Sequence, residues 1–424
     1  MSISASNTKA PNYYKSSAVF LFLSLLSAVI NYAYYPVIAR FLTPADFGAV
    51  QALVAILLQV GAIFAGLNLA TIYLVNKLNF ERSKRAVEIL QKLTTGVFIA
   101  ATMAVIIFQA AVMNFLNIDN PLYIFILALD LITTIPFIIA FGYLQARRQF
   151  VTAGTLQLSV VLVKLFAGAA LARRYGASGA LAGIALGQVL GMFLFWIVGS
   201  FYHFRLWDHR VLGGLSLPSA AELKFIKPLA KATGAIFLVN VILVIYISFS
   251  IIAARHYFEP HTSGLFTGAS TIASAAVFVC LPLIGVLLPH LNIKSLVANK
   301  SELAKTSAMV LIVAGASIAV LAAVSSQLLQ IFGKDYRAMS YLMVRLGIMM
   351  SLVATISLAS QVGAFYAPVR TAVICLAGFL VLAIAVMKNH ATLASFVSTM
   401  TAVFATIALV GILQIIWIYN HGSQ

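Results

Sequence analysis

Long apolar stretches fill this chain, and short polar stretches separate them. Twelve of the apolar stretches have about 17 residues or more, which is long enough for a helix to cross the hydrocarbon core of a bilayer. The pattern therefore predicts an all-α polytopic membrane protein with about twelve transmembrane helices. The predicted helices cover residues 16–38, 47–75, 89–113, 122–144, 151–171, 178–201, 229–254, 263–288, 306–326, 339–364, 371–387 and 391–419.

The longest interruption of the apolar pattern, residues 202–228, lies at the middle of the chain. It divides the chain into an N-terminal six-helix bundle (1–205), a cytoplasmic linker (206–228) and a C-terminal six-helix bundle (229–424). Two interpretations of the linker stay open, a solvated connection or an amphipathic helix along the membrane interface.

The two halves share a loop pattern. The loop after the first predicted helix runs from Ala39-Arg40 through Pro44 to Gly48, and the loop after the seventh runs from Ala254-Arg255 through Pro260 to Gly264. Weak internal symmetry of this kind is common in transporters, although two loops can also match by chance.

Composition points to lipid as the main solvent of the protein. The chain is 62% hydrophobic and only 9% charged, with a mean hydropathy of +1.03, whereas about a quarter of the residues of a soluble domain are charged. The net charge of +17 would indicate nucleic acid in a soluble protein. Here the basic residues cluster in loops beside lipid headgroups, so we expect no nucleic-acid partner.

The positions of the basic residues predict the orientation. Eighteen of the 27 lysines and arginines fall on the side of the N-terminus, seven fall on the other side, and Lys164 and Arg345 fall within helices. Basic loops stay in the cytoplasm, so both termini are expected there. The apolar run 16–38 is longer than the core of a signal peptide and is read as the first transmembrane helix.

Three segments carry a resemblance to a known family. Residues 35–48 (Tyr-Pro-Val-Ile-Ala-Arg-Phe-Leu-Thr-Pro-Ala-Asp-Phe-Gly), 224–229 (Lys-Phe-Ile-Lys-Pro-Leu) and 331–336 (Ile-Phe-Gly-Lys-Asp-Tyr) occur in this order along the chain. Together with the helix count they resemble the polysaccharide-biosynthesis flippases, which include O-antigen and exopolysaccharide translocases. These belong to the multidrug/oligosaccharidyl-lipid/polysaccharide exporter superfamily. The chain departs from the family pattern in one respect, since its seventh predicted helix has no acidic residue.

The resemblance implies two six-helix bundles around a central cavity, in the cytoplasmic membrane of a bacterium. It also implies that a polyprenyl-diphosphate-linked oligosaccharide is moved between leaflets by alternating access, for synthesis of a cell-surface polysaccharide. The implied partners are this lipid-linked oligosaccharide, membrane lipids and other membrane proteins of polysaccharide assembly. We expect no cofactor; the energy source stays open between coupling to Na⁺ or H⁺ and consumption of the product outside.

Charged residues within the bilayer are functional candidates by default. Asp130 lies roughly 12 Å, and Lys164 roughly 10 Å, from the same membrane face at the helical rise. Two interpretations stay open. The two side chains form a structural ion pair, or Lys164 binds a substrate phosphate while Asp130 binds the coupling ion.

Three arginines complete the candidate substrate-binding set. Arg345 lies roughly 9 Å into the tenth predicted helix, where its guanidinium either reaches the outer headgroups or binds pyrophosphate in the cavity. Arg40 and Arg255 follow the first and seventh helices. They either contact substrate or hold the carbonyl groups of a helix C-terminus.

Other chemistry finds little support in the sequence. There is no Gly-x-x-x-x-Gly-Lys-Ser/Thr loop for ATP and no His-Glu-x-x-His zinc motif. Cys280 and Cys375 lie in apolar runs and are read as small hydrophobic residues, so no catalytic residue or metal ligand is expected. Two alternatives to the flippase remain: a cation-coupled multidrug exporter of the same superfamily, and a membrane-embedded glycan polymerase or acyltransferase.

Overall fold

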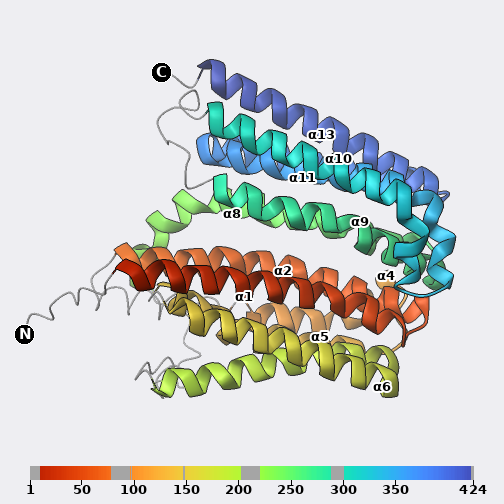
Figure 1. The fold of residues 1–424 in the computed structure, drawn as a ribbon, viewed down its shortest axis with the longest axis horizontal. Helices are drawn as coiled ribbons and strands as arrows, with labels where there is room; N and C mark the ends of the chain where they lie inside the picture. The colour runs from red at the N-terminus through yellow and green to blue at the C-terminus, as the bar shows by residue number, and fades with distance from the viewer. Residues whose placement is uncertain are drawn as a thin grey trace, which may run out of the picture. The chain divides into compact units, whose positions relative to one another are not determined.

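The computed structural model describes residues 10–77, 96, 98–146, 149–201, 220–287 and 300–421. In these residues the secondary structure is helical and contains no strand (Figure 1). Each of the twelve predicted stretches overlaps a helix, so the predicted all-α fold class is confirmed.

The first half of the chain supplies α1 (Ala10–Ala39), α2 (Pro44–Lys77), a helix at Phe98–Ile107, α4 (Gln109–Leu116), α5 (Leu122–Ala146) and α6 (Phe150–Phe201). The second half supplies α8 (Ala220–Tyr257), α9 (Pro260–Leu287), α10 (Lys300–Gln330), the 3₁₀-helix η3 (Asp335–Leu342), α11 (Met343–Tyr366), α12 (Pro368–Lys388) and α13 (Leu393–His421).

The chain forms two compact units. Unit 1 contains Met1–Leu42 and Phe64–Ile226, and unit 2 contains Thr43–Ile63 and Lys227–Gln424. The first half of α2 therefore packs with the second half of the sequence. The second division lies in the predicted linker 206–228. The domain boundaries drawn from the sequence remain a prediction.

Many of the helices can cross a membrane. Nine helices of the described ranges are long and apolar enough, or ten if the bent pair Phe98–Ile107 and Gln109–Leu116 is one span. The prediction of one continuous helix over 89–113 is wrong in its described part, because the chain bends by 69° between these two helices. The bend falls at Phe108, whose ψ of 17° is not helical.

The helix α6 is a pair of antiparallel arms rather than one span. Its span of 45 residues, Phe150–Leu194, would be about 68 Å long, twice the hydrocarbon core. Gly176 reverses the chain with φ 59° and ψ −139°, a combination open essentially only to glycine. The arms then touch where a Cβ on Gly183 would lie 2.2 Å from the Gly168 Cα atom. These arms correspond to the predicted helices 151–171 and 178–201.

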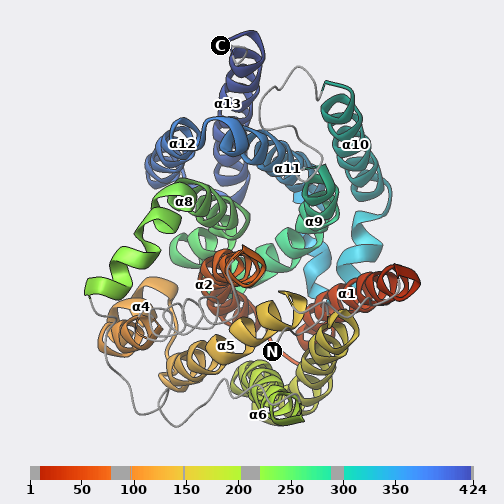
Figure 2. The same ribbon diagram turned by 90° about the vertical axis from the view of Figure 1, so that its left-hand side faces the viewer.

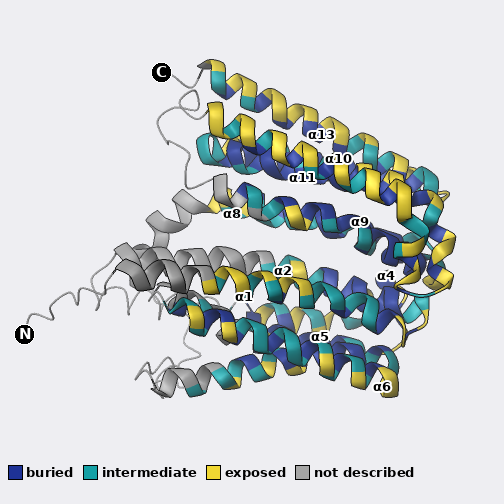
Figure 3. Ribbon diagram, viewed as in Figure 1, coloured by how far each residue is buried: buried dark blue, intermediate teal, exposed yellow. Residues whose placement is uncertain are grey.

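The core of unit 2 consists of α9 and the segment η3–α11. In each, 72% of the most apolar window is buried, against 17% in α10 (Figure 3). In unit 2, α11 packs against α9, α10, α12 and α13 (Figure 2). The peripheral helices keep apolar side chains exposed, which suits contact with lipid.

Several sequence predictions fall outside the described residues. They include Arg82, Lys84, Arg85, Arg147, Arg148, Lys294 and the first part of the linker. From Ala220 onward the predicted linker is helical, because α8 begins there rather than at residue 229.

Candidate functional site

Lys164 is buried in unit 1 and is held by α1. The residue lies on the first arm of α6 and is 9% exposed. Its Nζ atom donates a hydrogen bond of 2.8 Å to Oδ1 of Asn31. The ammonium also lies 4.4 Å from the ring centroid of Tyr34 and 5.1 Å from that of Tyr35. An amide oxygen and two ring faces thus surround the cation, an environment that favours positive charge.

Tyr34 joins this cluster to the second arm of α6. Its hydroxyl donates a 2.6 Å hydrogen bond to the carbonyl oxygen of Ala180, and the whole side chain is buried. Its ring fills the space beside Gly168, where an added Cβ would come within 2.5 Å of the ring. We call Asn31, Tyr34, Tyr35 and Lys164 the lysine cluster.

The sequence singles out Lys164, and Asn31 as a polar residue that lines the cavity or joins helices, but it does not predict the contact between the two. Asn31, Tyr34 and Tyr35 are spaced i, i+3 and i+4, so they share one helix face. This polar and aromatic face on an otherwise apolar helix is the sequence feature that could have indicated a binding partner for Lys164.

Asp130 is buried in unit 1, and one oxygen of its carboxyl group has no hydrogen-bond partner among the described residues. It lies on α5 and is 4% exposed. Among the described residues, its Oδ1 atom accepts no hydrogen bond. The hydroxyls of Thr133 and Thr134 donate to the backbone oxygen of Asp130 instead. A buried carboxylate in this state is costly unless it takes up a cation or a proton.

The ion pair considered between Asp130 and Lys164 is not formed in the described residues. No oxygen of Asp130 lies within 4 Å of the Lys164 ammonium, which donates to Asn31. Asp130 and Lys164 are thus both buried in unit 1, and their side chains are not bonded to each other.

Arg255 is buried in unit 2 and fixes a junction of helices. It is 4% exposed, and its Nη1 atom donates to the carbonyl oxygens of Ala45 at 3.1 Å and Pro260 at 3.2 Å. These carbonyls belong to the first turns of α2 and α9, not to a helix C-terminus. Arg255 thus has a structural role, and substrate binding by it stays a prediction.

Arg40 and Arg345 are exposed. Arg40 follows the end of α1, and Arg345 lies in the first turn of α11. Arg345 is therefore nearer to the start of its helix than the sequence placed it. Neither arginine belongs to the lysine cluster, and their roles as substrate ligands also remain predictions.

The two copies of the loop pattern meet inside unit 2. Gly48 and Gly264 are the equivalent glycines of the two loops, and an added Cβ on Gly48 would lie 2.9 Å from the Gly264 Cα atom. A Cβ on Gly264 would lie 1.7 Å from the Pro44 carbonyl oxygen. Glycine is required at this contact because the two backbones touch.

Metal ions are held by sets of ligand side chains that lie close together. The part of the chain with coordinates has no group of three His, Cys, Asp or Glu side chains that could hold a metal ion.

Comparison with known proteins gives one family match and a shared fold. Residues 14–293 match the model of a family described as "Polysaccharide biosynthesis protein". No curated protein sequence matches significantly.

Several solved structures are similar over nearly the whole chain. An inward-facing multidrug resistance MATE family transporter of the MOP superfamily has a TM-score of 0.71 at 14% identity, covering 96% of this chain and 98% of that one. The lipid II flippase MurJ in an inward closed conformation has 0.68 at 12%, covering 95% and 87%. An outward-facing MATE transporter has 0.65 at 13%, covering 96% and 94%. At these identities the likeness shows the fold.

Proposed function

Because the chain belongs to the polysaccharide biosynthesis protein family, we propose that it is a flippase for a lipid-linked oligosaccharide. Its cargo would be a glycan joined by a diphosphate to a polyprenyl chain. The barrier to moving this cargo is the transfer of the glycan and the diphosphate through hydrocarbon, since the polyprenyl chain can stay in the bilayer. The protein lowers that barrier by supplying polar and cationic partners.

The observation that carries the proposal is the buried Lys164 ammonium. Within the described residues it makes no ion pair, and its side-chain hydrogen bond goes to the neutral amide oxygen of Asn31. An ammonium has three donors, so Lys164 has capacity for a phosphate oxygen once the unit rearranges. A charge-assisted bond to phosphate is about twice as strong as a neutral one. A substrate phosphate would therefore bind the donors of Lys164 that Asn31 does not use.

Asp130 supports coupling to a cation. Its carboxyl group is buried and has an oxygen without a hydrogen-bond partner, so binding of Na⁺ or H⁺ removes the cost of that buried charge. Because Asp130 and Lys164 are buried in the same unit, cation binding at Asp130 also changes the electrostatic potential at Lys164. Ion binding and phosphate binding are then linked through one unit.

A second candidate, a cation-coupled multidrug exporter, is favoured by this same carboxyl group. A cationic drug would be attracted to Asp130 and repelled by Lys164. The polymerase or acyltransferase alternative has no observation in its favour. The two transporter hypotheses therefore differ in the charge of their cargo.

Depletion of the protein in its native host tests the flippase proposal. We expect lipid-linked oligosaccharide to accumulate in the cytoplasmic leaflet, where an impermeant glycan-modifying reagent added outside does not reach it. A complementing wild-type copy should restore outward exposure. Normal exposure of the glycan together with increased sensitivity to cationic drugs would instead establish the exporter.

A further inference from the structure

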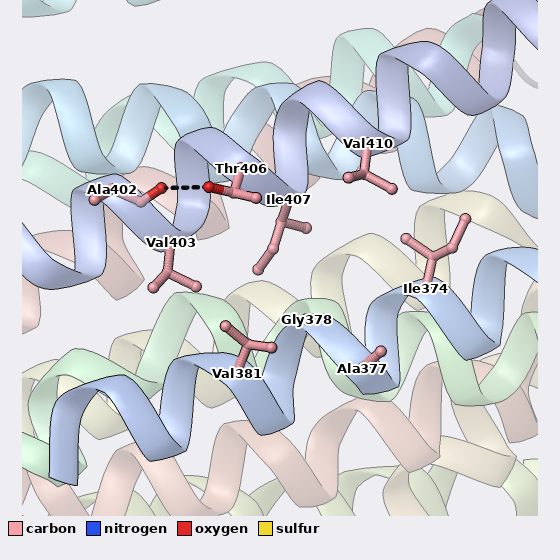
Figure 4. A pocket seen from close by; sticks show the side chains of 9 residues that line it. All are labelled: Ile374, Ala377, Gly378, Val381, Ala402, Val403, Thr406, Ile407 and Val410. Atoms are coloured by element: carbon pink, nitrogen blue, oxygen red, sulfur yellow. Dashed lines mark hydrogen bonds between the residues drawn. The ribbon is translucent and has the colours of Figure 1, made fainter. Parts of the chain in front are cut away.

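An apolar groove runs between α12 and α13 in unit 2. Its volume is about 360 Å³, near the lower end of ligand pockets. Gly378 and Ile407 are buried at its floor, while Val381, Thr406 and Val410 stand exposed at its rim. Figure 4 shows the side chains of the two antiparallel helices facing each other across it.

The lining offers hydrocarbon contact and no free polar group. The one polar side chain, Thr406, donates its hydroxyl to the carbonyl oxygen of Ala402 at 3.0 Å within α13. Ala377, Gly378 and Ala402 are small, and they open the space between the larger side chains. A linear apolar chain fits such a surface, whereas a polar ligand would lose its hydrogen bonds.

One end of the groove carries a positive charge. The Arg370 guanidinium lies 4.1 Å from the ring centroid of Trp417. Arg370, Ile374, Ala377 and Val381 follow the spacing i, i+4, i+7, i+11, which places them on one face of α12. Arg370 is therefore one helical turn, about 6 Å, beyond the groove.

Arg370 is available to an anion. It is exposed, and no carboxylate in the described part of the chain lies within ion-pair distance of it. It is also in the first turn of α12, whose N-cap Ala367 makes no side-chain capping bond. The free N–H groups of a helix N-terminus favour a negative group at the same end.

We propose that this groove binds an anionic glycerophospholipid, with the phosphate on Arg370 and one acyl chain along α12 and α13. The distance from Arg370 to Val381 is about 16 Å along the helix, which matches the depth of one leaflet, about 15 Å. Bilayer phospholipid surrounds these helices and greatly outnumbers any other lipid, so it is the occupant that mass action supplies. The proposal does not depend on what the protein transports.

The groove and Arg370 contribute to lipid binding in different ways. An acyl chain gains little by leaving other acyl chains for an equally apolar groove, so the groove sets position rather than affinity. One arginine near headgroup level favours an anionic lipid about fivefold. The preference for anionic over zwitterionic lipid should therefore depend on Arg370.

Photo-crosslinking of the full-length protein in nanodiscs tests the proposal. The probes are phosphatidylglycerol and phosphatidylcholine with a diazirine in one acyl chain, each diluted into unlabelled phosphatidylcholine. We expect the phosphatidylglycerol probe to label residues 374–381 and 402–410 about fivefold more than the phosphatidylcholine probe. Arg370→Gln should remove this preference, while Lys388→Gln, at the other end of α12, should keep it.

Filling the groove supplies the second measurement. Ala402→Leu should reduce labelling of the groove-lining residues Ala377, Gly378 and Val403 by both probes, and Ala405→Leu, on an exposed position of α13 outside the groove, should not. Both variants should melt like the wild-type protein. The proposal would be overturned if both probes label the wild-type protein equally and if Arg370→Gln does not change that labelling. Displacement by substoichiometric polyprenyl phosphate, or protection of the groove by a second copy of the chain, would also overturn it.

Discussion

At the residue scale, unit 1 contains two buried charges that make no contact ion pair in the described residues. Lys164 has the amide oxygen of Asn31 and the rings of Tyr34 and Tyr35 around it. Asp130 has a carboxyl oxygen with no partner. A pair that only joined two helices would be expected to close to bonding distance. Their separation favours binding of a different ligand by each.

Replacing Lys164 by alanine should impair transport far more than folding. A hydrogen bond to a charged group contributes about 1.5–3 kcal/mol, so loss of the phosphate contact should lower transport roughly 10- to 100-fold. Transport of a lipid-linked oligosaccharide into proteoliposomes, divided by the amount of monodisperse inserted protein, measures this.

Two matched variants separate charge from packing at this position. Asn31→Ala removes the partner but keeps the ammonium, and should retain most of the transport. Lys388→Ala removes an exposed lysine on α12 and should change nothing. If Lys164→Ala reduces inserted protein as much as transport, then Lys164 is structural.

Replacing Asp130 by asparagine should uncouple transport from its ion gradient. The variant keeps the shape of the side chain and removes a buried charge, so its thermal stability should be equal to or higher than that of the wild type. Transport by proteoliposomes with and without a Na⁺ or pH gradient is the measurement. Continued dependence on the same gradient in the variant would assign coupling to another residue.

At the element scale, glycines set where helices reverse and where they touch. Gly176 reverses α6 into two arms, and Gly48 and Gly264 let the first turns of α2 and α9 approach each other. Arg255 then bonds carbonyl oxygens from both of these turns. The repeated loop pattern thus allows the starts of α2 and α9 to pack closely against each other in unit 2.

The Gly264→Ala substitution should destabilise unit 2. The added methyl group would lie 1.7 Å from the Pro44 carbonyl oxygen, and forced overpacking costs about 1–3 kcal/mol. Thermal unfolding in detergent should show a lowered midpoint.

The matched control is Gly315→Ala on α10. Its added Cβ would meet nothing within 4 Å, so helix propensity alone should leave stability unchanged or raised by up to about 1 kcal/mol. Equal midpoints for the Gly264 and Gly315 variants would show that the close contact between α2 and α9 is not required.

At the scale of the whole molecule, the even number of predicted spans puts both termini on one side of the membrane. The excess of lysine and arginine on that side predicts that it faces the cytoplasm. The exposed apolar helices α10 and α12 indicate contact with lipid, whereas the orientation stays a prediction.

Labelling of single cysteines in intact cells tests the orientation. After Cys280 and Cys375 are replaced, a membrane-impermeant maleimide should react with Asn120→Cys and Asn389→Cys from outside. Ser301→Cys and Asn420→Cys should react only after permeabilisation. These four positions are exposed. Labelling of Asn420→Cys in intact cells would contradict a cytoplasmic C-terminus.

The length of the apolar stretches was sufficient to locate the helices but not their bends or exact starts. The described part of 89–113 is two helices that meet at 69°, and α8 begins at Ala220. Hydropathy averages over many residues, whereas a bend depends on the torsion angles of one residue such as Phe108. Charge within apolar stretches found Lys164 and Asp130, yet it gave no information on Asn31 as the partner of Lys164.

By itself, the sequence determined that this protein is solvated by lipid, that it is built from helices and which family it belongs to. These properties follow from composition, from the length of apolar stretches and from short motifs, all of which are local in the chain. Only the tertiary structure decided that Lys164 bonds Asn31, that Arg255 is buried against two helix starts and that α12 and α13 leave a groove. Such contacts depend on which helix faces meet, and residues far apart in sequence determine those faces together.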